Sequence, residues 1–290
     1  MTWFTYAVLG AFLTSLSFIL EKKTLERVHS IDFAAALAFC AGLITLPVLF
    51  TSSWERMSFG ILMLIFGGSL LAALAFVEVT KGVRHMEIST SSPLFLTGPM
   101  ITTILAFIFL GEKLATVQLL GMLLLLIGTY VLETKHFFRL SEFTHNLLGD
   151  KYTRLIMLGL LLYGFSSLVD RVVLARWGVA PMLYVALTQL FIAFHFLVLT
   201  LFHRNSIAPS LSIIRTQWKS ILLIAILTCG YRIMNAHAQA LAAVGLVAAV
   251  KRSSSLFTTI IGGELFHDKN LLRKSFACLI MIAGVYLIVL

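Results

Sequence analysis

The sequence predicts an all-α membrane protein with ten transmembrane helices, arranged as two inverted five-helix repeats. Three observations support this fold class. The chain has 290 residues, of which 59% are hydrophobic and 12% are charged, whereas soluble domains usually contain about 25% charged residues. Apolar segments long enough to cross a bilayer recur from one end to the other. The second half of the chain also repeats polar landmarks of the first half.

Ten apolar segments, separated by short polar connections, are expected to form the ten helices. The longest connection, residues 134–154, lies between the fifth and sixth segments. It divides the chain into a first five-helix repeat, residues 1–133, and a second, residues 155–290. The expected helices cover residues 2–20, 32–50, 59–79, 88–110, 115–133, 155–170, 181–202, 219–238, 244–266 and 271–290.

Two ordered sets of matched residues support the repeat. An offset of 156 residues places 102–104 on 258–260, and an offset of 149 residues places 21–22 on 170–171. Because each repeat has an odd number of spans, the second copy enters the membrane from the opposite side. Inverted repeats of this kind underlie many transporters that work by alternating access. A duplicated helix bundle without a transport role is the alternative.

The basic residues have an uneven distribution. The chain carries 22 Lys and Arg against 13 Asp and Glu, a formal net charge of +9. Most of the basic residues fall in the odd-numbered connections, which is typical of cytoplasmic loops. We therefore attribute the charge to membrane orientation, with both termini outside, and expect no nucleic-acid partner. The cysteines lie in separate apolar segments without metal-binding spacing, so no metal or cofactor is expected; they are Cys40, Cys229 and Cys278.

The expected helix 244–266 contains two adjacent cations, Lys251 and Arg252. A cation in hydrocarbon costs about 2.5–3.5 kcal/mol on insertion scales. An internal carboxylate, a water-filled cavity or a bound anion would lower that cost. Lys251 lies about 10 Å inside the segment, at about 1.5 Å per residue. We expect at least one of the two to bind substrate, with snorkelling to the membrane surface as the alternative.

The expected helix 219–238 carries a second polar group inside an apolar segment. Tyr231 and Asn235 are four positions apart and share a face, and Arg232 lies next to them. Gln189, in the middle of 181–202, is a further candidate; a structural ion pair or an interhelical hydrogen bond is the alternative role. Few acidic residues lie inside the segments, so the three mid-span cations predict a positive cavity that favours an anion.

Residues 91–132 carry a family resemblance. They read as a Pro-containing helix, a Leu-Gly-Glu-Lys turn at 110–113 and a Gln-Leu-x-Gly helix that ends in Gly-x-Tyr. This combination resembles the EamA domain of the drug/metabolite transporter superfamily, and residues 244–290 resemble its second copy. The resemblance covers nearly the whole chain. It implies ten helices, an inverted repeat and carriage of small metabolites by alternating access, with both termini in the cytoplasm, contrary to the loop charges.

Other polar residues receive narrower predictions. Ser92, Pro93 and Pro99 are interpreted as a hinge or cavity wall, with a packing kink as the alternative. Glu112 and Asp268 are expected to cap the following helix rather than to bind a coupling ion. The pairs at 21–22 and 170–171 are expected to anchor helix ends at the membrane surface rather than to act as gates.

These observations predict a secondary transporter for a small organic anion, in the plasma (inner) membrane. A carrier or flippase for a lipid-linked phosphate is the alternative, since the same cations would suit it. An intramembrane enzyme is disfavoured because the sequence lacks clustered catalytic groups such as GxGD or HExxH. The expected partners are a small-molecule substrate and the lipid bilayer. The sequence does not indicate an oligomeric state.

Overall fold

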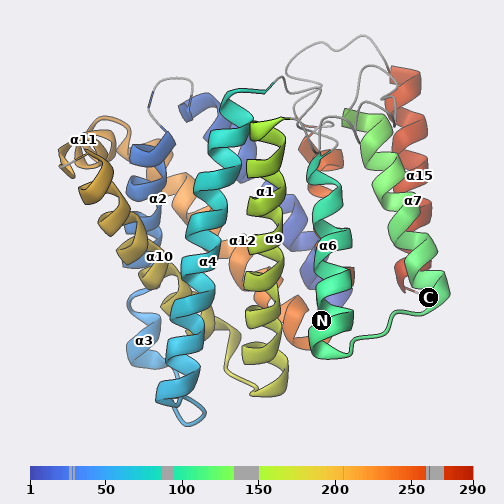
Figure 1. Ribbon diagram of the computed structural model, residues 1–290, viewed down its shortest axis with the longest axis horizontal. Helices are drawn as coiled ribbons and strands as arrows, with labels where there is room; N and C mark the ends of the chain where they lie inside the picture. The colour runs from blue at the N-terminus through green and yellow to red at the C-terminus, as the bar shows by residue number, and fades with distance from the viewer. Residues whose placement is uncertain are drawn as a thin grey trace. The chain divides into compact units, whose positions relative to one another are not determined.

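The fold is described from a computed structural model, which describes residues 1–25, 28, 30–86, 94–133, 150–204, 206–258, 261 and 271–289. Over these ranges the regular structure consists of helices and includes no strand, which confirms the all-α class (Figure 1). Six helices are long and apolar enough to cross a bilayer, and three apolar helical segments are shorter. The expected total of ten transmembrane helices is not confirmed.

Most of the expected helices are present, with shifted ends. In the first half of the chain they are α1 (Trp3–Leu25), α2 (Ser30–Thr45), α3 (Val48–Thr51), α4 (Phe59–Arg84), α6 (Thr97–Leu105) with the π-helical turn η1 (Ala106–Leu110), and α7 (Thr116–Glu133). In the second half they are α9 (Lys151–Arg171) with the π-helical turn η2 (Val172–Arg176), α10 (Pro181–Arg204), α11 (Ala208–Thr216), α12 (Trp218–Leu241), α13 (Val244–Lys251) and α15 (Leu271–Val289).

The prediction of one continuous helix over residues 244–266 is wrong, because α13 ends at Lys251. Beyond it the backbone tightens: the amide of Arg252 bonds the carbonyl of Ala249, and that of Ser253 bonds Val250. The Ser253 hydroxyl donates to the same Val250 carbonyl at 2.7 Å. Serine side chains compete for backbone partners in this way and interrupt helices. Helical geometry resumes at residues 254–258.

Two further differences have local causes. The expected helix 32–50 is divided at Pro47, which follows the end of α2 and precedes α3, since proline cannot donate the hydrogen bond that would continue α2. The polar connection after α10 contains an unexpected short helix, α11, with Pro209 in its first turn, where a missing amide hydrogen costs nothing.

The chain forms two compact units, each built from both halves of the sequence. Unit 1 contains residues 1–73 and 169–241, and unit 2 contains residues 74–168 and 242–290. This division by contacts differs from the sequence halves 1–133 and 155–290, and the internal repeat stays a prediction. In unit 1, α1 packs against α12, and α2 packs against α10 and α12. In unit 2, α13 packs against α6, and α7 packs along α15 (Figure 1).

The contact between α7 and α15 depends on glycine. A Cβ atom on Gly121 would lie 2.7 Å from the carbonyl oxygen of Gly284, and one on Gly284 would lie 2.5 Å from the backbone nitrogen of Leu125. Small residues let helix backbones approach closely, which is a common way for helices to associate in a bilayer. This pair of glycines explains why α15, at the end of the chain, packs so closely on α7.

Candidate functional site

Unit 1 contains a polar cluster centred on Arg232 of α12. Arg232 is partly buried, and its charge acts on Tyr184 of α10 and on Cys229 and Tyr231 of its own helix. The cluster also includes residues of α1 and the end of α9. A cation placed in this way, within a long apolar helix, needs polar neighbours, because hydrocarbon solvates it poorly.

One side of the cluster carries a carboxylate. The Tyr184 hydroxyl donates a hydrogen bond to Asp170 at the end of α9. Tyr184 is 5% exposed, and its backbone carbonyl accepts a bond from the Thr188 hydroxyl at 2.8 Å. Asp170 and Arg232 are therefore both neighbours of the Tyr184 ring, one through a hydrogen bond and the other through its charge.

The other side of the cluster reaches α1. Tyr231 directly precedes Arg232 on α12, and the charges of Arg232 and of Glu21 both act on it. Glu21 accepts a hydrogen bond from the Ser17 hydroxyl at 2.6 Å, and Ser17 and Thr228 have their hydroxyl oxygens 3.5 Å apart. A second carboxylate thus lies on the α1 side of the arginine.

Two amide side chains complete the cluster. Gln189 of α10 is 3% exposed and lies near the Cys229 thiol, which donates to the backbone carbonyl of Ala41 at 3.7 Å. Asn235 of α12 is 9% exposed, and a Cβ atom on Gly10 of α1 would lie 2.7 Å from its Oδ1 atom. Within the part of the chain that the structure describes, this Oδ1 atom is buried and accepts no hydrogen bond. Amides offer donors to an anion and acceptors to a protonated group.

The cluster therefore brings together three of the predicted site residues, Gln189, Tyr231 and Arg232. Asn235 lies three positions after Arg232 on α12, beside Gly10 of α1. The roles of Tyr184, Glu21 and Asp170 were not predicted. We expected residues 21–22 and 170–171 to anchor helix ends, but Glu21 bonds Ser17 and Asp170 bonds Tyr184. Their matched positions at an offset of 149 residues were the available signal.

The other predicted residues do not belong to this cluster. Lys251 and Arg252 lie in unit 2. Lys251 is exposed, whereas Arg252 is partly buried, with Nη2 3.2 Å from where a Cβ atom on Gly98 of α6 would lie. Pro99 is buried in the first turn of α6, where proline does not break the helix. Ser92 and Pro93 lie outside the described residues, as does Asp268.

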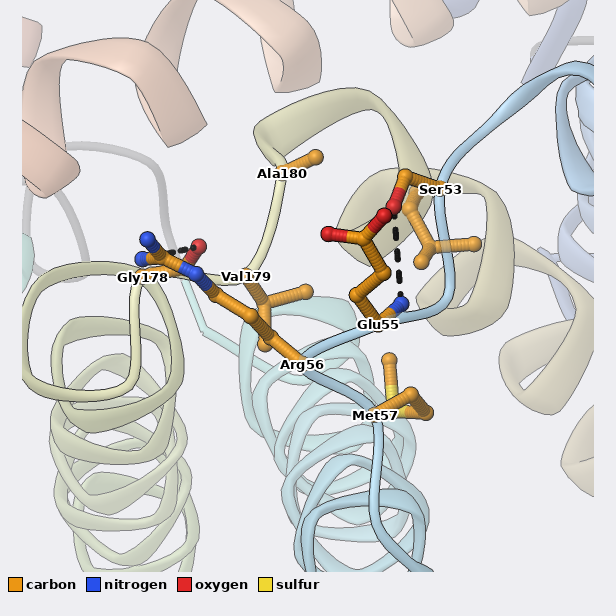
Figure 2. A pocket seen from close by; sticks show the side chains of 8 residues that line it. Ser53, Glu55, Arg56, Met57, Gly178, Val179 and Ala180 are labelled. Carbon is orange, nitrogen blue, oxygen red and sulfur yellow. Dashed lines mark hydrogen bonds between the residues drawn. The ribbon is translucent and has the colours of Figure 1, made fainter.

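A pocket of about 170 Å³ opens in the loops at one end of unit 1. Figure 2 shows Arg56 reaching the backbone of Gly178, whose carbonyl oxygen accepts a hydrogen bond from Nη1 at 3.3 Å. Gly178 has a φ of +62°, and a Cβ atom there would collide with the Arg56 guanidinium. The pocket is lined by Ser53, Glu55, Arg56, Met57, Gly178, Val179, Ala180 and Leu183. The predicted substrate-binding residues are not among them.

Among the residues that the structure describes, no group of three or more His, Cys, Asp or Glu is placed to hold a metal ion. The Arg232 cluster contains polar groups of several kinds. It combines a cation, two carboxylates, two phenols and two amides.

Comparisons with known proteins point to transport. The EamA-like transporter family matches residues 1–134. An uncharacterized transporter of Clostridium kluyveri is 25% identical over 131 residues, which are 43% of this chain and 42% of that protein, so the match spans less than half of the relative's length. A crystal structure of a protein that is 14% identical has a TM-score of 0.74 and covers 98% of this chain and 94% of its own, which shows a similar fold. With its several apolar helices, this is an integral, multi-pass membrane protein.

Proposed function

We propose that this chain, whose residues 1–134 match the EamA-like transporter family, is a secondary transporter that moves a small organic anion across the membrane by alternating access. The family supports a membrane transporter. The anionic substrate is inferred from the Arg232 cluster, and alternating access from the resemblance and the internal repeat.

The observation that carries the proposal is the set of donors around Arg232. A guanidinium group binds a carboxylate or phosphate through two parallel hydrogen bonds. Tyr231 directly precedes Arg232 on α12 and is affected by its charge, and Asn235 and Gln189 are buried on helices of the same unit. In this proposal Arg232 clamps the anion, and the phenol and the two amides orient it.

Asp170 and Glu21 limit how tightly the cluster binds an anion in this proposal. In this proposal the two carboxylates compensate the charge of Arg232 when no substrate is bound. Asp170 and Arg232 both act on Tyr184, and Glu21 and Arg232 both act on Tyr231. An arriving anion competes with them for the same cation, which keeps binding moderate. A transporter needs this moderation, because a site that binds too tightly does not let its substrate leave.

Lys251 and Arg252 are proposed as a second basic group, in unit 2, that meets the anion during the cycle. Lys251 is the last residue of α13, Arg252 follows it directly, and Arg252 packs against Gly98 of α6. Ser92, Pro93 and Pro99 are proposed as a hinge or cavity wall on the sequence alone.

The proposal is tested by ligand binding and uptake with the purified protein. Lactate, citrate, glucose 6-phosphate and AMP serve as probes in a thermal-shift assay, since a ligand that binds the folded state raises its unfolding temperature. We expect at least one probe to stabilise the protein, and Arg232→Ala to weaken its binding roughly tenfold or more, as expected for loss of hydrogen bonds to a charged group.

The matched control is Arg215→Ala, since Arg215 is exposed on α11. Uptake of the stabilising probe into vesicles should fall in Arg232→Ala and in Arg252→Ala but not in Arg215→Ala. Unchanged uptake in both of the first two variants would refute the anion site. Competition by short-chain phosphatidic acid, but not by soluble anions, would favour the lipid-linked phosphate carrier instead.

A further inference from the structure

The pocket in the loops of unit 1 is lined by charges of both signs. It lies between the loop 52–58, which joins α3 to α4, and the loop 177–180, which joins η2 to α10. Figure 2 shows Glu55 on one side of this pocket and the Arg56 guanidinium beside Gly178 on the other. The two charged residues are adjacent in the sequence, yet their side chains point away from each other, so a ligand between them can contact both charges.

Neither charge is neutralised within the part of the chain that the structure describes, where no ion pair involves Glu55 or Arg56. One N–H group of Arg56 donates to the Gly178 carbonyl at 3.3 Å. The bond between Glu55 and the Ser53 hydroxyl, at 3.4 Å, uses the Glu55 backbone amide and not its carboxylate. A guanidinium group has five donors and a carboxylate accepts several bonds, so both residues, which are exposed, retain groups that can bind a ligand.

The position of the pocket along the chain places it at the membrane surface. Each of its two loops connects two segments that are long and apolar enough to cross a bilayer. Each loop also carries an exposed tryptophan, Trp54 in the first and Trp177 in the second. The helix ends beside the first loop expose Phe50 and Phe59. Because tryptophan is enriched at the depth of the lipid headgroups, the pocket is expected to lie at that depth.

A headgroup with one charge of each sign complements this pair of residues. The phosphate of an ethanolamine headgroup accepts hydrogen bonds from a guanidinium group, and its primary ammonium donates hydrogen bonds to a carboxylate. A choline headgroup has no N–H to donate, and proteins usually hold it in a cage of aromatic rings. Within the described structure, the lining of this pocket contains no aromatic side chain. A glycerol headgroup carries only the negative charge, which Glu55 would repel.

We propose that this pocket binds the headgroup of a phosphatidylethanolamine lipid, with Arg56 on the phosphate and Glu55 on the ammonium. The volume of about 170 Å³ is below the range of about 300–1,000 Å³ that is usual for drug-sized ligands, which favours a headgroup over a larger metabolite. The acyl chains then lie outside the pocket, against the apolar helix ends. This site is separate from the Arg232 cluster, and it goes beyond the function proposed above.

The proposal is tested by native mass spectrometry of the full-length protein in detergent, with dihexanoyl phosphatidylethanolamine, phosphatidylcholine and phosphatidylglycerol as probes. We expect the ethanolamine lipid to bind roughly tenfold more tightly than the other two, which is the scale of one hydrogen bond to a charged group. Arg56→Ala should weaken its binding roughly tenfold. Glu55→Gln should abolish the preference for ethanolamine over choline. The matched control is Arg215→Ala, since Arg215 is an exposed arginine on α11, and it should bind the lipid like the original protein.

Three outcomes would overturn the proposal. Equal binding of the ethanolamine and choline lipids by the original protein would show that the ammonium is not recognised. A preference for ethanolamine that persists in both Arg56→Ala and Glu55→Gln would place the lipid elsewhere on the protein. Soluble O-phosphoethanolamine that binds as tightly as the lipid would make the occupant a dissolved zwitterion and not a lipid.

Thermal unfolding gives a second readout and checks that each variant is folded. A ligand that binds the folded state raises its unfolding temperature, so the ethanolamine lipid should stabilise the original protein and Arg215→Ala more than it stabilises Glu55→Gln. If Arg56→Ala fails to fold, Arg56→Lys replaces it, because lysine keeps the charge but lacks the forked donors of arginine. A folded Arg56→Lys protein that binds the ethanolamine lipid as tightly as the original would also overturn the assignment of Arg56 to the phosphate.

Discussion

Glu112 caps a helix that begins 132 residues later in the sequence. Its Oε2 atom accepts a hydrogen bond from the backbone amide of Val244, at 3.0 Å, in the first turn of α13. The residue before this turn, Ala243, has no side-chain cap. A carboxylate at this position satisfies a free amide and compensates the positive end of the helix dipole. The expectation of a capping role was correct, but the capped helix is a different one.

Loss of this cap should destabilise unit 2. We expect Glu112→Ala to lower the free energy of unfolding by about 0.5–2 kcal/mol, the usual effect of removing an N-cap. Glu112→Gln keeps an acceptor oxygen and should lose less. Thermal unfolding in detergent measures both, with Lys113→Ala at the exposed neighbouring position as control. Equal stability of Glu112→Ala and Lys113→Ala would mean that the cap contributes nothing.

The close packing of α7 on α15 should not tolerate a methyl group at Gly121. Its Cβ atom would lie 2.7 Å from the Gly284 carbonyl oxygen and 2.8 Å from the backbone nitrogen of Ile288. We expect Gly121→Ala to cost about 1–3 kcal/mol, as is typical of overpacking. Gly67→Ala is the control, since a Cβ atom there meets no atom within 4 Å. A stable Gly121→Ala protein would show that the two helices can separate at little cost.

Asp150 lies just before α9. It should make the stability of the folded protein depend on pH in the acid range. Its Oδ2 atom accepts bonds from the backbone amide and the hydroxyl of Thr153, both at 2.8 Å. The backbone bond, chiefly, lowers the pKa of this carboxyl below its ordinary value of 3.8. A lowered pKa in the folded state adds stability above the unfolded-state pKa, and the contribution is lost as the pH falls through the folded-state value.

We therefore expect the unfolding temperature to fall as acid protonates Asp150, and Asp150→Asn to weaken this fall. The measurement is thermal unfolding across the acid range in both proteins. The effect should be small, because Asp150 is close to solvent and its charge is well screened. Parallel pH profiles for Asp150→Asn and the original protein would contradict the prediction.

Tyr184→Phe tests the competition between Asp170 and a substrate anion. Without the Tyr184 hydroxyl, Asp170 loses a donor and compensates Arg232 more strongly. We expect binding of the stabilising probe anion to weaken roughly tenfold, the scale of one hydrogen bond to a charged group. Isothermal titration measures the change, with Tyr286→Phe as control because Tyr286 is 65% exposed. Tighter binding in Tyr184→Phe would reverse the assigned role of Asp170.

Sequence reasoning reached part of the candidate site and missed the rest for a physical reason. Tyr231 and Asn235 could be grouped because helix spacing places them on one face, and Arg232 because it adjoins Tyr231 in the same apolar segment. Glu21, Asp170 and Tyr184 come from three other helices, and their contacts with the cluster depend on which helices pack side by side. The break after Lys251 was also missed, since three consecutive serines permit a helix until their hydroxyls bond its carbonyls.

The sequence by itself determined that this protein is a bundle of membrane helices with cations inside apolar segments. This follows because hydropathy and helical hydrogen bonds are local properties, which a short window of residues specifies. Only the tertiary structure decided that Glu112 caps α13 and that Thr228 of α12 lies beside Ser17, the donor to Glu21. These contacts join residues far apart in the chain, and close helix packing brings them together; between α1 and α12 it is helped by the small residue Gly10.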